Sequence, residues 1–347
     1  MRQISVAIIG FGNVGQAFAS LLLKKQADLK KQFDLEIIMT GIYTKNHGSA
    51  INSGGVNLSR ALEYVQQGTD LSNLSEGNRS RSPQEFINDS SAEIIIECTP
   101  LNPYDGQPAL SFIKSALNRG KHVITANKGP VVYGFHELSE IAEDHKKGFY
   151  FESAVMDGAP IFSLFRETLP LIELKGFTGI LNSCTNYLLD LMNDGYSLEE
   201  ATIQAQKIGI TETDPSADID GWDAAIKVSA LATVIMGIPL TPHQVERQGI
   251  RDITKEMIDD SFKKEEKWKL VCTAKRHGNR IIEASVKPKS VKNDSPLYQV
   301  TGTSSFIEFE TDFLPGLGIL ERDPGPITTA YGIFADLMNL YQKFYAF

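Results

Sequence analysis

Residues 4–26 read ISVAIIGFGNVGQAFASLLLKKQ, an apolar run followed by a glycine-rich turn and an amphipathic stretch. The apolar run predicts a buried strand, and the pattern after it predicts a helix that starts near Asn13. Between the two, Gly10 makes the tight turn, Gly12 lets the backbone approach a pyrophosphate, and Gly15 lets helix and strand pack closely. The alternative is a glycine-rich turn that binds no ligand. The residues expected to form this dinucleotide site are Gly10, Phe11, Gly12, Asn13, Val14 and Gly15.

Strand and helix patterns continue to alternate through the first half of the chain. Alternation of this kind is typical of a parallel sheet with helices on both faces, so we predict an α/β, doubly wound, Rossmann-type fold. The expected strands are 35–43, 92–99, 122–126 and 149–153, and the expected helices between them are 107–119 and 135–147. A Ser-, Asn- and Gly-rich region at 45–83 is expected to be surface loop around a short helix at 57–67.

The second strand ends next to Thr44 and Lys45, which are candidate cofactor contacts. A fold of this kind that selects NAD usually places an acid here to bind the ribose 2′-hydroxyl. Residues 44–47 contain no acid, and the Lys45 ammonium suits a 2′-phosphate. The sequence therefore favours NADP over NAD.

Ligands of doubly wound sheets bind at the carboxyl ends of the strands. Thr99 and Lys128 follow two of the expected strands, so both side chains are expected to face the cofactor. Cys98, beside Thr99, has two interpretations. It is either an inert core residue at the end of a buried strand or the nucleophile of an aldehyde dehydrogenase that forms a thioester.

Composition limits the function classes. With 34 basic and 43 acidic residues the formal net charge is −9, which argues against nucleic-acid and anionic-membrane partners. No apolar run approaches the roughly 20 residues that cross a bilayer, and the N-terminus leads directly into a strand without a signal-peptide pattern. The three cysteines, Cys98, Cys184 and Cys272, are widely spaced, which favours a reducing, cytoplasmic compartment.

The pattern changes in the second half. Helices are expected at 159–169, 184–193, 197–208 and 221–236, and strands at 174–182, 268–275, 280–287 and 304–310. These indicate an α+β domain with an antiparallel or mixed sheet. We therefore expect a dinucleotide domain at 1–150, a substrate and dimerisation domain at 151–324, and a C-terminal helix at 325–347 that returns to the first domain.

One expected helix carries an acid and a base within an apolar run. Residues 220–237 read DGWDAAIKVSALATVIMG, with Asp220 as the expected N-cap and Asp223 and Lys227 four residues apart on one face. Such a pair is usually a surface salt bridge. The alternative is an amine prepared for proton transfer by partial burial beside a carboxylate. Periodicity alone leaves both interpretations open.

The motifs GFGNVG, ECTP, TANKGP, ILNSCTNYLL, ITETDPSADIDGWDAAIKV and GPITTAYGIFADL follow one another along the chain. In order and rough spacing the chain resembles homoserine dehydrogenase over nearly its whole length. Its most specific part is E-x-D-P-x-x-D-x-x-G-x-D-x-x-x-K, from Glu212 to Lys227. The chain looks like a short form, without a kinase or regulatory domain.

The resemblance implies roles for the charged residues. It makes Lys227 the proton donor and acceptor, Asp223 a substrate ligand that holds Lys227, and Glu212 the ligand of the substrate ammonium, with Asp218 as a further acid. It places Lys128 between nicotinamide and substrate. It also implies cofactor contacts at Gly209 and Gly325, the interconversion of L-homoserine and L-aspartate 4-semialdehyde in threonine, methionine and isoleucine biosynthesis, and a homodimer.

The resemblance further implies a monovalent cation, sodium or potassium, in the turn after the strand at 149–153. Its ligands would be the side chain of Glu152 and the backbone carbonyls of Val155, Asp157 and Ala159. Asp157 stands where the family often has glycine, so its carboxylate either strengthens or replaces that site. NSCTNY likewise stands where N-G-T-x-N-Y is common, which puts Ser183 and Cys184 near the substrate.

Two rival functions stay open. One is another NAD(P)-dependent oxidoreductase, such as an aspartate-semialdehyde dehydrogenase that uses Cys98. The other is a module that senses NADPH without turnover. Such a module has no need to keep Glu212, Asp223 and Lys227 together.

Overall fold

The computed structural model describes residues 1–76, 80–211, 214–278 and 281–346. Its contacts divide the chain into two compact units, Met1–Pro160 with Gly325–Phe347, and Ile161–Pro324. The first unit runs to Pro160 rather than to the expected residue 150, because the segment after residue 150 bonds to the start of the C-terminal helix. Within the described ranges, no helix is long and apolar enough to cross a membrane.

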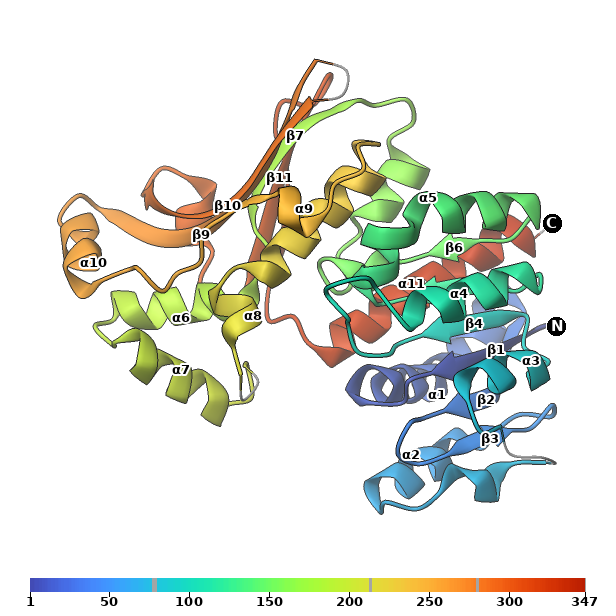
Figure 1. Cartoon of the computed structure of the whole chain (residues 1–347). Helices are drawn as coiled ribbons and strands as arrows, with labels where there is room; N and C mark the ends of the chain where they lie inside the picture. Colours follow the sequence, from blue (N-terminus) through green and yellow to red (C-terminus); the bar gives the residue numbers. More distant parts are fainter. Residues whose placement is uncertain (77–79, 212–213, 279–280, 347) are drawn as a thin grey trace. The chain divides into compact units, whose positions relative to one another are not determined.

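The described residues of the first unit form a six-stranded sheet in the order β3-β2-β1-β4-β5-β6 (Figure 1). All neighbouring strands are parallel except the edge pair β2 and β3. Strand β1 lies at the centre and its apolar side chains are buried on both faces, as a central parallel strand requires. The strands are β1 Arg2–Ile9, β2 Leu35–Tyr43, β3 Ser49–Ile51, β4 Ile94–Glu97, β5 His122–Thr125 and β6 Phe149–Tyr150.

Of the described helices of this unit, five lie between its strands along the chain, as the alternating pattern predicts, and the last is formed by the C-terminal segment. They are α1 Asn13–Phe33, α2 Leu58–Gln66, α3 Pro83–Asp89, α4 Ala109–Asn118, α5 Lys128–Asp144 and α11 Pro326–Phe344. Helix α1 packs against α11, and α4 packs against α5. Residues of β1, β2, α1 and α11 share one apolar core, so the C-terminal helix is an integral part of this unit.

The region expected to be loop contains more structure than its composition suggests. The helix near 57–67 is present as α2, but β3 precedes it and a 3₁₀ turn, Leu71–Leu74, follows it. Ser49 and its neighbours form a strand because they pair with the end of β2 and so bury an edge that would otherwise be unpaired. Pairing with residues 41–43 of β2, not the composition of the segment, makes this strand.

The described residues of the second unit form a mixed six-stranded sheet in the order β12-β11-β7-β9-β10-β8. Its neighbours are antiparallel except β8 and β10. The strands are β7 Leu174–Ile180, β8 Glu246–Arg247, β9 Glu266–His277, β10 Ile281–Lys292, β11 Ser305–Thr311 and β12 Leu317–Glu321. The helices are α6 Ser183–Asn193, α7 Leu198–Lys207, α8 Ser216–Ile219, α9 Trp222–Val234 and α10 Lys255–Phe262. Helices α6 and α9 both contact β9.

Two expectations about helices in this unit are wrong. The helix expected at 159–169 is only a five-residue π-helical turn, Leu164–Thr168. The sequence has a helical period there, but only over a short stretch. Helix α9 begins after Gly221 rather than after Asp220, because Asp220 closes the short helix α8. The chain must reverse between the two helices, and Gly221 does so with a left-handed φ of +78° that glycine adopts readily.

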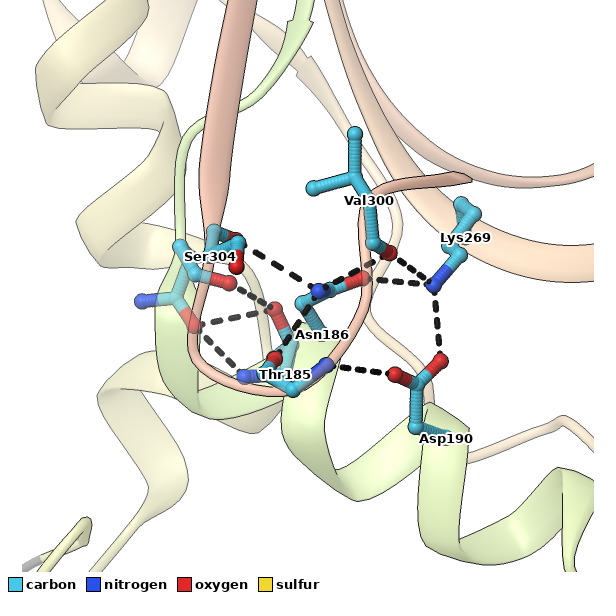
Figure 2. A network of polar contacts seen from close by, with 8 residues as sticks. Thr185, Asn186, Asp190, Lys269, Val300 and Ser304 are labelled. Atoms are coloured by element: carbon cyan, nitrogen blue, oxygen red, sulfur yellow. Dashed lines mark hydrogen bonds and ion pairs between the residues drawn. The ribbon is translucent and has the colours of Figure 1, made fainter. Parts of the chain in front are cut away.

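A fully buried lysine ties three segments of this unit together (Figure 2). Lys269 on β9 has an exposed fraction of 0%, and its Nζ donates to Asp190 Oδ1 at 2.7 Å, Asn186 Oδ1 at 2.9 Å and the Val300 carbonyl at 2.6 Å. Three acceptors match the three donors of an ammonium group. Asp190 in turn accepts from the Gly302 amide at 2.6 Å. The network fastens α6 to the sheet and to the turn before β11.

Candidate active site

The turn between β1 and α1 has the geometry that its glycines predict. A Cβ at Gly10 would lie 2.4 Å from the carbonyl oxygen of Cys98, and one at Gly15 would lie 2.5 Å from that of Gly10. Both glycines are therefore required for packing. Gly12 differs: it is the N-cap of α1, and no heavy atom of the described chain lies within 4 Å of its ideal Cβ. Phe11, Asn13 and Val14 complete the turn. The space at Gly12 is where a pyrophosphate would meet the helix amides.

We expect Gly12→Val to weaken coenzyme binding by about tenfold or more while the protein stays folded, because the added side chain fills the open space and not the core. NADPH fluorescence titration measures the affinity and circular dichroism the fold. Gly15→Val is the contrasting variant, expected to lower the melting temperature because its Cβ meets backbone at 2.5 Å. An unchanged NADPH affinity in Gly12→Val would contradict the phosphate-loop assignment.

The end of β2 presents the residues expected to contact the ribose. Thr44 is buried, and its Oγ1 accepts from the His47 amide at 2.7 Å and donates to the Gly48 carbonyl at 3.2 Å. The Thr44 hydroxyl therefore shapes the turn. Lys45, the next residue, is exposed. Its ammonium group is accessible to a ligand from solvent.

A buried acid organises the carboxyl ends of β4 and β5. Glu97 has no exposed surface; its Oε1 accepts from the Thr99 amide and its Oε2 from Thr125 Oγ1, each at 2.7 Å. Asn127 donates to the Thr99 carbonyl at 3.1 Å and caps α5, whose first residue is the half-buried Lys128. Burial raises the pKa of Glu97. Glu97 is not among the residues predicted from the sequence. Its signal there is an acid at the end of the apolar strand IIIE.

Cys98 does not suit the nucleophilic role of the rival dehydrogenase. Burial of the thiol and the adjacent Glu97 carboxylate raise the pKa of Cys98 well above its ordinary value. The thiolate is the reactive form, so a raised pKa makes this sulfur inert. The interpretation of Cys98 as a residue at the end of a buried strand agrees with this geometry.

The segment after β6 is bonded to α11. The Glu152 amide donates to Asp336 Oδ2 at 2.6 Å, and the Thr328 hydroxyl donates to Asp157 Oδ2 at 3.1 Å. Glu152 and Asp336 are both buried. Asp157 points its carboxylate at the start of α11, where Thr328 also accepts from the Gly325 amide at 2.8 Å. Val155 and Ala159, whose carbonyls were expected as ligands, are buried in the same segment.

The acid and base of α9 form a shielded pair. Lys227 Nζ lies 3.3 Å from Asp223 Oδ2, and the two side chains have exposed fractions of only 15% and 19%. Lys227 also donates to the carbonyl oxygen of Leu181 at 2.6 Å. The rest of α9 is largely buried. This pair is therefore not the exposed surface salt bridge that an i, i+4 spacing usually means.

A second acid joins the pair through an asparagine. Asn182 Nδ2 lies 2.7 Å from Asp218 Oδ1 and 2.9 Å from Asp223 Oδ2. Burial and the nearby charge of Asp223 raise the pKa of Asp218. The structure thus brings together Asp218, Asp223 and Lys227, all named from the sequence, and adds Asn182, which the sequence analysis missed.

Cys184 lies against this cluster and not merely in the core. It stands in the first turn of α6, near enough to Asp218 and Asp223 for both carboxylates to act on its thiol. Burial and the carboxylate of Asp218 raise the pKa of Cys184 to about 12, so the thiol stays protonated. A protonated thiol beside a carboxylate is a weak donor, not a nucleophile.

Two further expected site residues fall between α7 and α8 in the sequence. Glu212 lies outside the residues that the structure describes. Gly209 follows α7 with a left-handed φ of +75° and donates its amide to the Gln206 carbonyl at 3.1 Å. Its assignment as a cofactor contact stays a prediction, as do the roles of the other site residues.

The two units define a class of protein, an NAD(P)-dependent oxidoreductase with a Rossmann-type coenzyme unit and a separate α+β unit. Comparison with known families gives the same result for both parts of the chain. Residues 10–152 match the model of the homoserine dehydrogenase NAD-binding domain, and residues 160–338 match the model of homoserine dehydrogenase. The chain belongs to the homoserine dehydrogenase family.

Individual relatives agree over nearly the whole chain. An NAD(+)-dependent homoserine dehydrogenase from Pseudomonas canavaninivorans is 32% identical over 99% of this chain and 97% of its own. The homoserine dehydrogenase of Methanocaldococcus jannaschii is 37% identical over 98% and 99%. A crystal structure of a putative homoserine dehydrogenase from Archaeoglobus fulgidus has a TM-score of 0.86 at 30% identity over 97% and 99%. A hyperthermophilic archaeal homoserine dehydrogenase in complex with NADPH has a TM-score of 0.83 at 29% identity over 99% of each chain.

Proposed function

We propose that the enzyme interconverts L-homoserine and L-aspartate 4-semialdehyde, a step of amino-acid biosynthesis, with Lys227 as the acid and base. The observation that carries the proposal is the shielded pair on α9, where the Lys227 ammonium is held by Asp223 and by the Leu181 carbonyl. Oxidation of an alcohol removes a proton from oxygen as hydride leaves carbon. A positioned amine takes up that proton and returns it in the reverse direction.

The acids near Lys227 suit an amino-acid substrate. Asp218 and Asp223 carry two formal negative charges against the one positive charge of Lys227, which leaves an excess of one. A substrate ammonium group compensates that excess. We assign ammonium binding to Glu212 and Asp218. We assign two tasks to Asp223, which binds the substrate and also holds Lys227.

The coenzyme unit fits a dinucleotide, since the open space at Gly12 is one that a Cβ would fill. When bound, the coenzyme supplies or accepts the hydride. We assign to Lys128, the first residue of α5, a contact with both nicotinamide and substrate. We assign further coenzyme contacts to Thr99, Thr44, Gly209 and Gly325.

We expect NADP to be preferred over NAD, because Lys45 is exposed at the end of β2 and residues 44–47 contain no acid. The test follows NADPH oxidation at 340 nm with L-aspartate 4-semialdehyde, and the reverse reaction with L-homoserine, for each coenzyme. Lys45→Ala should lower kcat/KM for NADP and leave that for NAD nearly unchanged. A larger value for NAD in the wild type would contradict the role of Lys45, and no turnover with either would contradict the proposed reaction.

We also propose that the enzyme is a homodimer formed through the sheet of the second unit. Helices α6 and α9 pack on this sheet, while Thr178, Thr273, Lys275 and Glu308 line a hollow of about 340 Å³ on strands β7, β9 and β11. A hollowed sheet surface of this kind suits a second copy of the chain. Sedimentation equilibrium gives the oligomeric state.

Three unpaired cysteines support a reducing, cytoplasmic location, which cell fractionation tests.

A monovalent cation, sodium or potassium, would be held by the buried carboxylate of Glu152 and the carbonyls of Val155, Asp157 and Ala159. The Asp157 carboxylate, which accepts from Thr328, replaces no ligand in this arrangement and instead fixes the turn to α11. The melting temperature with potassium, sodium and tetramethylammonium chloride at equal ionic strength tests the proposal. Equal melting temperatures in all three salts would contradict it.

A further inference from the structure

Asn182 lies at the start of helix α6 and contacts the acids of α8 and α9. It follows β7, caps helix α6 and has an exposed fraction of 5%. Its Oδ1 accepts from the Thr185 amide at 2.8 Å and from the Thr185 hydroxyl at 2.9 Å. The Thr185 backbone amide can only donate, so the oxygen of the Asn182 amide must be the atom that faces the helix.

This orientation directs the amide nitrogen of Asn182 at the two acids. Its two N–H groups meet Asp218 Oδ1 at 2.7 Å and Asp223 Oδ2 at 2.9 Å, and carboxylates only accept. The acids come from α8 and α9, and Asn182 lies before α6. One side chain therefore fixes three helix starts relative to one another.

The two carboxylates need such a bridge because they repel each other. The described charged and titratable groups that face Asp218 are Asp223 and Lys227 from α9 and Cys184 from α6. Asp223 raises the pKa of Asp218, whereas Lys227, Asn182 and Cys184 lower it. Hydrogen bonds from a neutral amide favour the charged form of each acid without adding a charge that a substrate ammonium would have to displace.

We propose that Asn182 is a positioning residue of the substrate site: its amide holds Asp218 and Asp223 together so that both can receive the substrate ammonium group, while its oxygen caps α6. This inference rests on the proposed function, which supplies the ammonium. Asn182 does not itself act on the reacting atoms.

The test separates the two tasks of the side chain. Ser and Asp are N-caps as good as Asn, so Asn182→Ser and Asn182→Asp keep the cap and lose the amide donors. Asn182→Ser should melt within a few degrees of the wild type, whereas the third buried carboxylate of Asn182→Asp should lower the melting temperature further. Each should raise KM for homoserine by about tenfold or more, since hydrogen bonds to charged groups are lost, with KM for the coenzyme unchanged. The matched control is Asn57→Ser, the same exchange at the N-cap of α2, which should leave both KM values unchanged.

The pH dependence of kcat/KM for homoserine distinguishes the proposed role of Asn182 from a purely structural one, which would leave it unchanged. Loss of a donor to a carboxylate raises its pKa, so the acidic limb of kcat/KM for homoserine should shift to higher pH in Asn182→Ser. It should shift further in Asn182→Asp, which adds a third negative charge. An unmoved acidic limb with unchanged KM would overturn the proposal.

A measurement without turnover keeps this test independent of the proposed reaction. In ¹³C-aspartate NMR, with Asp218→Asn to assign the signal, the carboxyl of Asp218 should titrate at higher pH in Asn182→Ser than in the wild type. An equal titration in the two proteins would overturn the bridge even if homoserine is the substrate. Wild type without homoserine activity would overturn the proposed function, while the NMR titration still decides the role of Asn182.

Discussion

Lys227→Ala should lower kcat for homoserine oxidation by a factor on the order of 10² to 10⁴, the usual contribution of a positioned acid or base. KM should change much less, because the proton moves only as the transition state forms. The structure sharpens this expectation, since Lys227 is largely shielded and held by Asp223 and the Leu181 carbonyl. Steady-state kinetics in both directions measure the effect, with circular dichroism to show that the variant is folded.

Two further variants identify what the lysine does. Lys227→Arg keeps the positive charge but cannot release its proton, so it should be nearly as slow as Lys227→Ala. A Lys227→Arg enzyme with high kcat would show that charge alone is required. Lys128→Ala, alone and combined with Lys227→Ala, tests whether the Lys128 amine can substitute for that of Lys227. Substitution would appear as non-additive effects of the two changes on kcat. Full kcat in folded Lys227→Ala would move the acid–base role to Lys128.

Lys269→Met should cause a large loss of stability, lowering the free energy of unfolding by about 3–5 kcal/mol. The reason is that Asp190 would keep its charge without the lysine, the Asn186 oxygen would lose its donor, and the Val300 carbonyl would keep only the Asn186 amide as a donor (Figure 2). Each lost kcal/mol lowers the melting temperature of a unit this size by roughly 2–4 °C. Differential scanning calorimetry measures the change.

The matched control for Lys269 lies directly opposite on the neighbouring strand. Lys289 pairs with Lys269 in the β9–β10 register but is exposed, so Lys289→Met should leave the melting temperature nearly unchanged. Asp190→Leu added to Lys269→Met removes the unpaired charge and should restore part of the stability. Equal effects of Lys269→Met and Lys289→Met would show that the buried network contributes nothing to stability.

The sequence by itself determined the features that depend on neighbouring residues. The β1–turn–α1 unit, the alternation of strands and helices, and the i, i+4 placement of Asp223 and Lys227 are local, because each follows from residues within one or two turns of one another. Family resemblance extended this to the remaining acids and to the reaction. The rigid requirement for Gly10 and Gly15 is also visible in sequence, since a strand-to-helix turn leaves no room for Cβ atoms there.

Only the tertiary structure decided which polar groups meet across the chain. Asn182 reaches acids 36 and 41 residues away, and Lys269 finds Asp190 after 79 residues. The shielding of Lys227 likewise involves a distant partner, because the Leu181 carbonyl that accepts from it lies 46 residues away. A polar residue in a sequence looks the same whether water or a buried acceptor satisfies it, because burial and partner are properties of the folded chain.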